Sequence, residues 1–269
     1  MAAATITLVG IPQCLAYAMM AGLPPAYGLV TAAIPGLVAA LAGRSTQLVT
    51  GPTNTTGLLV LAAVTPWLAD TGFVTTEGLT VVATLAVLAG LVRLGLAAVG
   101  GAALVRFLPE SVLAGFTAGA GLLIGVMQLD EALGLPAISA GGLIDAVLGL
   151  GRDWTSGARP TTAAALVTAG TIGAILLVKK VRPKWPAALL GVVAAGLASA
   201  ALGLSAETGL VLINERSPMP QGWPLIAMPS TDLSLWRQLL VPACAIVLLG
   251  TLELAVTARA DGARPSMRR

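Results

Sequence analysis

The stretch Gly51-Pro52-Thr53-Asn54-Thr55-Thr56-Gly57 lies inside apolar sequence and decides how the rest of the chain is organised. A proline beside small hydroxyl and amide residues is typical of a helix N-terminus. The apolar residues that follow, 58–69, would form about 18 Å of helix at about 1.5 Å per residue. A hydrocarbon core of about 30 Å needs a longer helix. The stretch therefore predicts a half-helix that begins part-way through a membrane.

The N-terminus of such a half-helix presents unpaired N–H groups and the positive end of the helix dipole. Irregular backbone at this depth is tolerated only where it lines protein or water, and in transporters it lies at the substrate site. The positive end favours an anion. Ordinary capping by the side chains of residues 53–56 is the alternative, because their oxygens can satisfy the same N–H groups.

The composition is that of a membrane protein. Of the 269 residues, 57% are hydrophobic and 10% are charged, whereas a soluble domain carries about 25% charged residues. The net charge of +3 is spread along loops and indicates no nucleic-acid partner. Two cysteines in apolar runs and the lack of histidine argue against a disulfide framework and a histidine-ligated metal. We expect no cofactor.

Hydrophobic runs predict an all-α polytopic membrane protein with about eight membrane segments. Besides the half-helix at 52–68, the segments lie at residues 2–21, 27–42, 76–99, 110–129, 161–178, 185–204 and 241–258. The first run continues through Pro12 and Gln13 without a preceding cleavage site, so we expect no signal peptide. Residues 44–50 are predicted as a short strand, and residues 140–150 as a surface helix.

Basic residues orient the chain. With the N-terminus inside, most lysines and arginines fall on one side, and only Arg152, Arg159, Arg216 and Arg237 fall on the other. The positive-inside rule selects this arrangement. We therefore expect a multi-pass protein of the inner (plasma) membrane with both termini in the cytoplasm.

Polar side chains inside the predicted spans are candidates for function. Gln13 follows Pro12 in mid-membrane, where it could bond another helix, cap the carbonyl that Pro12 frees, or contact a substrate. Tyr17 is four residues further on and shares that helix face, although a tyrosine there also serves packing. Arg93 lies within an apolar run and could snorkel to the surface, so we assign it no role.

Glu253 is an acid placed well inside a predicted span, which is costly and by default functional. Thr257 at i+4 and Gly250 at i−3 put a hydroxyl and a small residue on the same helix face. That face suits Na⁺ or a carried proton, while a structural hydrogen bond to the first span is the alternative. The sequence shows no acid pair, metal cluster or nucleophile–base constellation, so we expect no enzyme activity.

Several motifs resemble the sulfate permease (SulP) family of anion transporters. The first-span signature is similar to residues 11–18 (IPQCLAYA) and 21–29 (AGLPPAYGL), and the third-span turn to residues 49–53 (VTGPT). The fifth span resembles residues 111–119 and 128–129, and the eighth residues 245–253 and 257–260. The resemblance covers nearly the whole chain to about residue 260, and its first motif is highly specific.

The resemblance implies a seven-plus-seven inverted-repeat fold, with an anion held between the first, third, eighth and tenth spans. It implies that Gln13 and Tyr17 line the anion site and that Thr53, with Asn54 at the half-helix N-terminus, binds the anion. Glu253 and Thr257 fall where sodium-coupled bicarbonate members bind Na⁺. Transport would proceed by an elevator-like or rocking movement.

The sequence departs from the family pattern after the eighth span. Residues 1–260 correspond to the first repeat and the eighth span, and residues 261–269 form a basic tail that we expect to be cytoplasmic. The rest of the second repeat and the STAS domain have no counterpart, so half of the implied anion site is missing. We expect a fragment, or a chain completed by a homodimer or by a second-repeat chain.

These observations predict a secondary transporter of sulfate, bicarbonate or a similar small oxyanion or carboxylate, coupled to Na⁺ or H⁺ and embedded in the lipid bilayer. The alternatives are a truncated or non-transporting membrane protein or assembly partner, and an anion channel. Saturable, gradient-coupled uptake would favour the carrier, whereas conductance unaffected by counter-ions would favour the channel.

Overall fold

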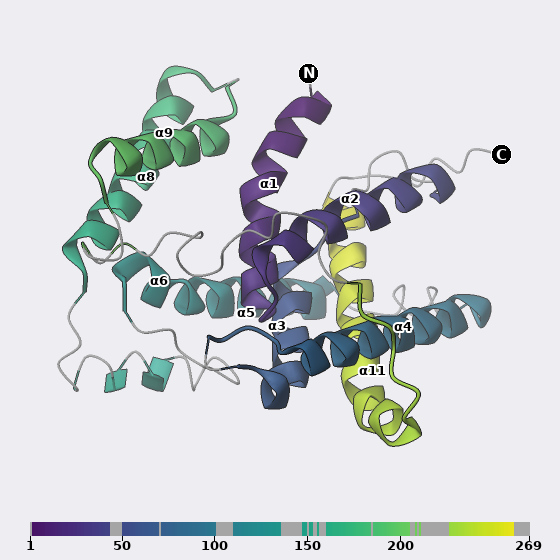
Figure 1. Cartoon of the computed structure of the whole chain (residues 1–269). Helices are drawn as coiled ribbons and strands as arrows, with labels where there is room; N and C mark the ends of the chain where they lie inside the picture. The colour runs from purple at the N-terminus through teal and green to yellow at the C-terminus, as the bar shows by residue number, and fades with distance from the viewer. Residues whose placement is uncertain are drawn as a thin grey trace. The chain divides into compact units, whose positions relative to one another are not determined.

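A computed structural model describes residues 2–43, 50–69, 71–100, 110–135, 147–149, 151–152, 155, 160–183, 185–204, 208, 210 and 226–260. Within these residues the chain is helical, and its extended pairing is limited to one isolated bridge between Leu68 and Val74. Figure 1 shows the helices in order from purple at the N-terminus to yellow at the C-terminus. The predicted all-α class is confirmed.

Each predicted membrane segment coincides with a helix. The helices are α1 (Ala2–Met20), α2 (Pro25–Ala42), α3 (Asn54–Val64) with the 3₁₀ turn η1 (Thr65–Trp67), α4 (Thr76–Ala98), α5 (Glu110–Met127), α6 (Leu129–Leu133), α8 (Thr162–Val181), α9 (Ala187–Ala201) and α11 (Leu233–Ala260). Among the described residues, α2, α4, α8 and Leu233–Leu254 of α11 are long and apolar enough to cross a membrane. The exact number of crossings stays a prediction.

The third segment is the expected half-helix. Thr53 precedes α3 in an extended conformation (φ −120°, ψ 152°), and its side chain accepts a hydrogen bond from the N–H of Thr56. The 11 residues of α3 correspond to about 17 Å of helix, well short of a full crossing. The hydroxyl cap and the following apolar run therefore produce the short helix that the sequence predicts.

Several helix ends differ from the prediction by a few residues, and the start of the last span differs most. The last span was expected from residue 241, but α11 begins at Leu233, because Asp232 caps its first turn and Pro242 is accommodated inside the helix. The fifth span was expected to reach residue 129, but α5 ends at Met127 and the short α6 follows. Residues 44–49 of the predicted strand at 44–50, and residues 140–146 and 150 of the predicted surface helix at 140–150, lie outside the described residues.

The chain divides into two compact units. One consists of residues 1–12 and 120–218, and the other of residues 13–119 and 219–269. In the second unit, α3, α4 and α11 pack around buried apolar side chains: Val64, Val81, Leu85, Leu88, Leu239 and Ala243. Figure 1 shows the yellow α11 beside the blue α4 in this unit. This packing brings α11 to the half-helix.

Glycines allow the first three helices to approach one another closely. A Cβ at Gly28 of α2 would overlap the backbone carbonyl of Cys14 in α1. A Cβ at Gly57 of α3 would lie 3.4 Å from the carbonyl oxygen of Tyr17. Small residues at helix contacts are the usual way in which membrane helices pack. The start of α3 is thereby held against the second half of α1.

In the other unit, α8 and α9 form a helical hairpin, and α6 packs against α8. Thr168 of α8 donates a hydrogen bond to the carbonyl of Ala132 in α6 at 3.1 Å. A Cβ at Gly191 of α9 would overlap the side chain of Ile175 in α8, so the two helices are in close contact there.

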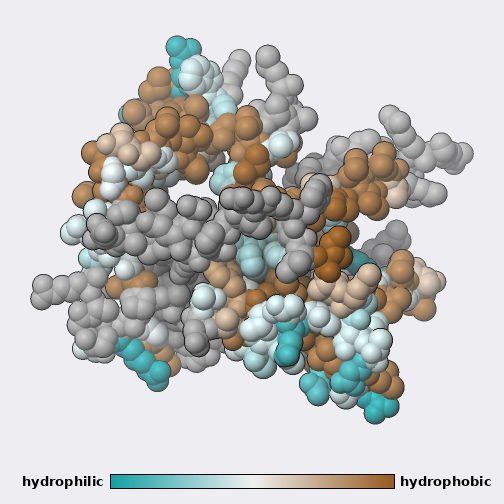
Figure 2. Space-filling view, viewed as in Figure 1, coloured by the Kyte–Doolittle hydropathy of each residue, from teal (hydrophilic) through white to brown (hydrophobic). Residues whose placement is uncertain are grey.

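Large apolar side chains face outward on both units. The exposed fraction is 80% for Leu41, 69% for Leu94, 72% for Leu166 and 75% for Val241. In Figure 2 brown, hydrophobic residues accordingly cover much of the visible surface of the helices. Exposed apolar surface of this kind marks contact with a membrane or with other protein.

Candidate functional site

The carboxylate of Glu253 meets the N-terminus of the half-helix. The hydroxyl of Thr53 donates to Oε2 of Glu253 at 2.9 Å, and the hydroxyl of Thr55 donates to Oε1. These bonds join α11 to α3 across about 200 residues of sequence. The structure thus brings together the two features that the sequence singled out separately.

Thr53 is at the centre of this arrangement. Its hydroxyl oxygen lies 2.9 Å from Glu253 Oε2 and 2.8 Å from the hydroxyl oxygen of Thr56. A hydroxyl has one proton to donate and lone pairs to accept with. When Glu253 is ionised, Thr53 therefore donates to the carboxylate and accepts from Thr56. Removing the Thr53 oxygen would break both contacts.

Asn54, the first residue of α3, adds an unpaired acceptor. Its side chain is buried, with an exposed fraction of 9%, and its Oδ1 atom has no hydrogen-bond partner among the described residues. A buried amide oxygen without a partner is costly unless a water, a cation or a ligand donor satisfies it. The first turn of α3 thus offers both N–H donors and a free oxygen.

Gln13 and Tyr17 form a pair on one face of α1. The amide of Gln13 donates to the hydroxyl of Tyr17 at 2.7 Å, one helical turn away. Gln13 is exposed and Tyr17 is half-buried. This bond lies within one helix, so it differs from the interhelical bond and the carbonyl cap that the sequence suggested. The backbone of Tyr17 lies against Gly57 of α3, which places the pair beside the half-helix.

Thr257 has a local partner. Its hydroxyl donates to the backbone carbonyl of Glu253 at 2.9 Å, and the side chain is exposed. Thr251, on the same helix, makes an equivalent bond to the carbonyl of Val247. The hydroxyl proton of Thr257 therefore does not point at the Glu253 carboxylate, although its oxygen keeps free lone pairs.

Sequence reasoning missed two contacts of this region. The first is the contact of Thr55 with Glu253. It was missed because nothing in the sequence distinguished Thr55 from the neighbouring threonines. Arg93 of α4 lies against α11, with its Nη2 atom 3.3 Å from the place a Cβ would occupy at Gly250. Gly250 is one turn before Glu253, so α4 carries a cation to the helix that bears the acid. An arginine inside an apolar run was the available signal.

The donor set is one of oxygens. The described residues contain no group of three or more His, Cys, Asp or Glu side chains that could hold a metal ion. A carboxylate with hydroxyl and carbonyl oxygens suits hard cations rather than soft metals. The chemistry available at α3 is hydrogen bonding, charge pairing and proton or alkali-cation binding.

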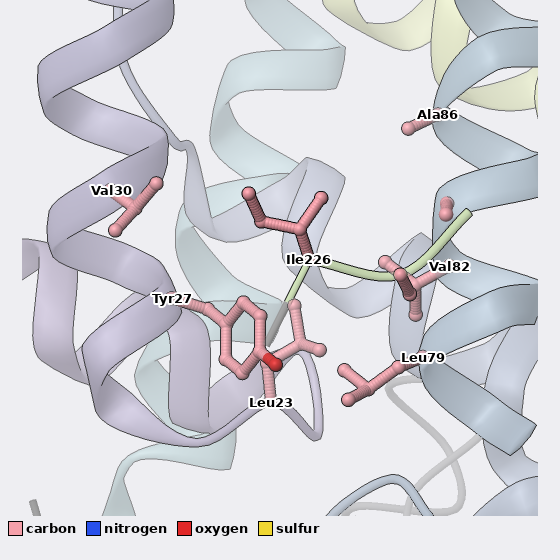
Figure 3. Close-up of a pocket in the computed structure, with 9 residues that line it drawn as sticks. Leu23, Tyr27, Val30, Leu79, Val82, Ala86 and Ile226 are labelled. Atoms are coloured by element: carbon pink, nitrogen blue, oxygen red, sulfur yellow. The ribbon is translucent and has the colours of Figure 1, made fainter. Parts of the chain in front are cut away.

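A cavity of about 230 Å³ lies elsewhere in the same unit, between α2, α4 and residues 226–227 (Figure 3). Figure 3 shows Tyr27, Val30, Leu79 and Val82 around it, with the Tyr27 hydroxyl as the polar atom in view. None of the predicted site residues lines it. Its apolar walls make it unsuited to a small anion.

The fold and the site define the class: a multi-pass membrane protein in which a half-helix meets an intramembrane carboxylate. The sequence profile of the sulfate permease family matches residues 1–265, and the chain belongs to that family. The resemblance drawn from the motifs is confirmed.

Relatives in the family share sequence over the whole chain or over half of it. A protein of Mycobacterium tuberculosis (strain H37Rv), named as a probable sulfate transporter, is 30% identical over 266 residues, covering 98% of this chain and 45% of its own length. Sulfate transporter 4.1, chloroplastic, of Arabidopsis thaliana is 37% identical over 139 residues, covering 50% of this chain. This chain spans about half the length of the Mycobacterium tuberculosis relative, which it matches almost from end to end. These relatives are named as transporters, which confirms the expectation that the chain is not an enzyme.

Solved structures share the fold. The transmembrane domain of the cyanobacterial bicarbonate transporter BicA matches with a TM-score of 0.76 at 23% identity, over 96% of this chain and 64% of that chain. The structure of SLC26A9 matches with a TM-score of 0.74, over 96% of this chain and 43% of that chain. These matches confirm the predicted transporter fold.

Proposed function

We propose that this protein is the site-bearing half of a secondary anion transporter. The substrate class is a small oxyanion or carboxylate such as sulfate or bicarbonate. Residues 1–260 form the transporter domain, residues 261–269 a basic cytoplasmic tail, and the anion binds at the N-terminus of α3. The observation that carries the proposal is the contact of Glu253 with Thr53 and Thr55 at that terminus.

The first turn of α3 supplies the anion-binding groups. The N–H groups of Asn54 and Thr55 and the positive helix end attract negative charge. The Thr53 hydroxyl can donate to an anion when it no longer donates its hydrogen bond to Glu253. Gln13 and Tyr17 of α1 add an amide and a hydroxyl beside this turn. Neutral donors of this kind bind an oxyanion without a fixed counter-charge.

Glu253 supplies a physical basis for coupling. An anion at the start of α3 would lie beside the carboxylate, and like charges at this range repel strongly in a low dielectric. A proton or Na⁺ on Glu253 removes that repulsion, so anion and cation bind together. The Asn54 Oδ1 atom and the Thr257 oxygen are further oxygens for Na⁺.

The two compact units support movement as the transport step. Every proposed site residue, from Gln13 to Thr257, belongs to the unit made of residues 13–119 and 219–269. A unit that carries all of these residues can move as a body against the remainder. The same proposal has a second copy or a second-repeat chain complete the site. It also places the protein in the inner membrane, with both termini in the cytoplasm.

The test is labelled-anion binding and uptake by the purified chain in proteoliposomes, alone and with a second-repeat chain. Sulfate, bicarbonate and fumarate are each tested with and without Na⁺ and pH gradients. We expect Thr53→Val to weaken anion affinity about tenfold or more, since a hydrogen bond to a charged group contributes about 1.5–3 kcal/mol. We expect Glu253→Gln to make binding independent of Na⁺ and pH.

Thr251→Val is the matched control, because it removes a hydroxyl from α11 that, among the described residues, bonds only its own helix. Wild-type binding by Thr53→Val and Glu253→Gln would show that the site assignment is wrong. Absence of uptake in both preparations would favour a non-transporting membrane protein. Conductance that does not depend on the counter-ion would favour a channel.

A further inference from the structure

The turn between α8 and α9 concentrates positive charge. Lys179 and Lys180 lie in the last turn of α8, Arg182 is its C-cap residue, and Lys184 follows in the sequence. No acidic residue occurs between Asp153 and Glu207. Helix α6, whose sequence includes two acidic residues, also contacts α8. That contact is at Thr168, which lies about 16 Å along α8 from Lys179. The cluster therefore has no counter-charge within its own hairpin.

Backbone hydrogen bonds and a ring contact link the described residues of the turn. The N–H of Arg182 donates to the carbonyl of Val178 at 2.8 Å, and the N–H of Trp185 donates to the carbonyl of Arg182 at 2.9 Å. The guanidinium of Arg182 lies over the Trp185 ring, 5.7 Å from its centroid. Stacking on a ring occupies the face of a guanidinium and leaves its in-plane N–H donors available. Arg182 is thus positioned to bind a group with several oxygens.

The cluster lies at the end of a lipid-facing surface. Leu176, Leu177 and Val181 of α8 have exposed fractions of 61%, 62% and 62%, and α8 is long and apolar enough to cross a membrane. Trp185 is itself 55% exposed. In Figure 2, teal side chains lie at the end of this otherwise brown hairpin. Cations and a tryptophan directly after an apolar span are typical of headgroup depth.

We propose that the α8–α9 turn is a binding site for the phosphate of anionic membrane lipids. Lys179, Lys180 and Arg182 hold the phosphate, with Arg182 able to donate two parallel hydrogen bonds. Trp185 packs at the boundary between headgroup and acyl chain. The negative end of the α8 dipole, about half a charge, opposes an anion there, but three cations outweigh it. The site lies outside the proposed transport site and does not depend on it.

The test measures fluorescence quenching of Trp185 in nanodiscs that contain brominated phosphatidylglycerol or brominated phosphatidylcholine. The difference between the protein and its Trp185→Phe variant isolates the signal. We expect stronger quenching by phosphatidylglycerol. Lys179→Gln and Arg182→Gln should each weaken apparent phosphatidylglycerol affinity about fivefold, because one basic residue near an anionic surface contributes about 1 kcal/mol. Arg182→Lys keeps the charge and should lose less.

The matched control is the double variant Arg152→Gln, Arg237→Gln, which removes charge from exposed positions elsewhere. It should leave the preference for phosphatidylglycerol unchanged, and inorganic phosphate should not displace the lipid. Equal quenching by both lipids would overturn the proposal. An equal loss in the control would attribute the effect to net charge, and displacement by phosphate would show a site for free anions; either result would also overturn it.

Discussion

At the scale of single residues, the hydroxyl of Thr84 joins the segment that precedes α11 to α4. Thr84 is fully buried, accepts a hydrogen bond from the N–H of Ser230 at 2.8 Å, and donates to the carbonyl of Thr80 at 2.7 Å. The Thr84→Val variant keeps the shape and leaves the Ser230 N–H without its partner. We expect it to lower stability by about 1–3 kcal/mol, measured by thermal unfolding in detergent and by amide exchange at Ser230.

Thr251→Val is again the matched control. The Thr251 hydroxyl bonds the carbonyl of Val247 in its own helix and accepts from no described backbone N–H group. Its loss should change stability by clearly less than the loss of the Thr84 hydroxyl. Equal Tm values for the two variants would contradict the assigned role of Thr84.

At the scale of an element, the start of α11 depends on an ionised cap. Asp232 accepts hydrogen bonds from the N–H of Ser234 at 2.9 Å and from its hydroxyl at 2.7 Å. The side-chain bond first, and the backbone bond second, lower the pKa of Asp232 below its usual value of 3.8. This is the capping geometry that stabilises a helix N-terminus.

The pH dependence of this cap follows from the sign of the shift. Because the pKa is lower in the folded state, the cap stabilises the helix above the unfolded value of 3.8, and the contribution is lost as pH falls through the lower folded value. We expect amide protection at Ser234 to decrease below about pH 4. The Asp232→Asn variant, which keeps an acceptor but cannot titrate, should show no such decrease. A decrease of the same size in both proteins would rule out the cap as its cause.

At the scale of the whole molecule, the two compact units should respond separately to substitution. Gly191→Val would push a side chain of α9 into Ile175 of α8, and overpacking of this kind costs about 1–3 kcal/mol. We expect faster amide exchange across α8 and α9, with exchange in α4 unchanged. Hydrogen exchange followed by mass spectrometry measures both regions in one experiment.

Gly196→Val, in the same helix, provides the control, because nothing lies within 4 Å of a Cβ at that position. It carries the same change in helix propensity without the clash. Faster exchange in both units of Gly191→Val would mean that they unfold as one body. That result would also weaken the proposal that one unit moves against the other.

The sequence was informative wherever local chemistry acts. Thr53 and the short apolar run after it predicted a half-helix, because capping and helix length depend only on neighbouring residues. The predicted start of α11 was eight residues too late. Judged from neighbouring residues alone, two polar residues and a proline, Arg237, Gln238 and Pro242, suggest a loop. The capping of Asp232 and the packing of Leu239 against α4 outweigh those signals.

By itself, then, the sequence determined the membrane class, the order of the helices, the family and the residues with unusual polarity for their depth. Those properties follow from hydrophobicity and motif spacing, which are local. The tertiary structure alone decided that Glu253 meets Thr53 and Thr55, that Gln13 pairs with Tyr17 within one helix, and that Arg93 lies over Gly250. The contacts of Glu253 and Arg93 join helices far apart in the chain, and their partners depend on how glycines and small residues let those helices pack.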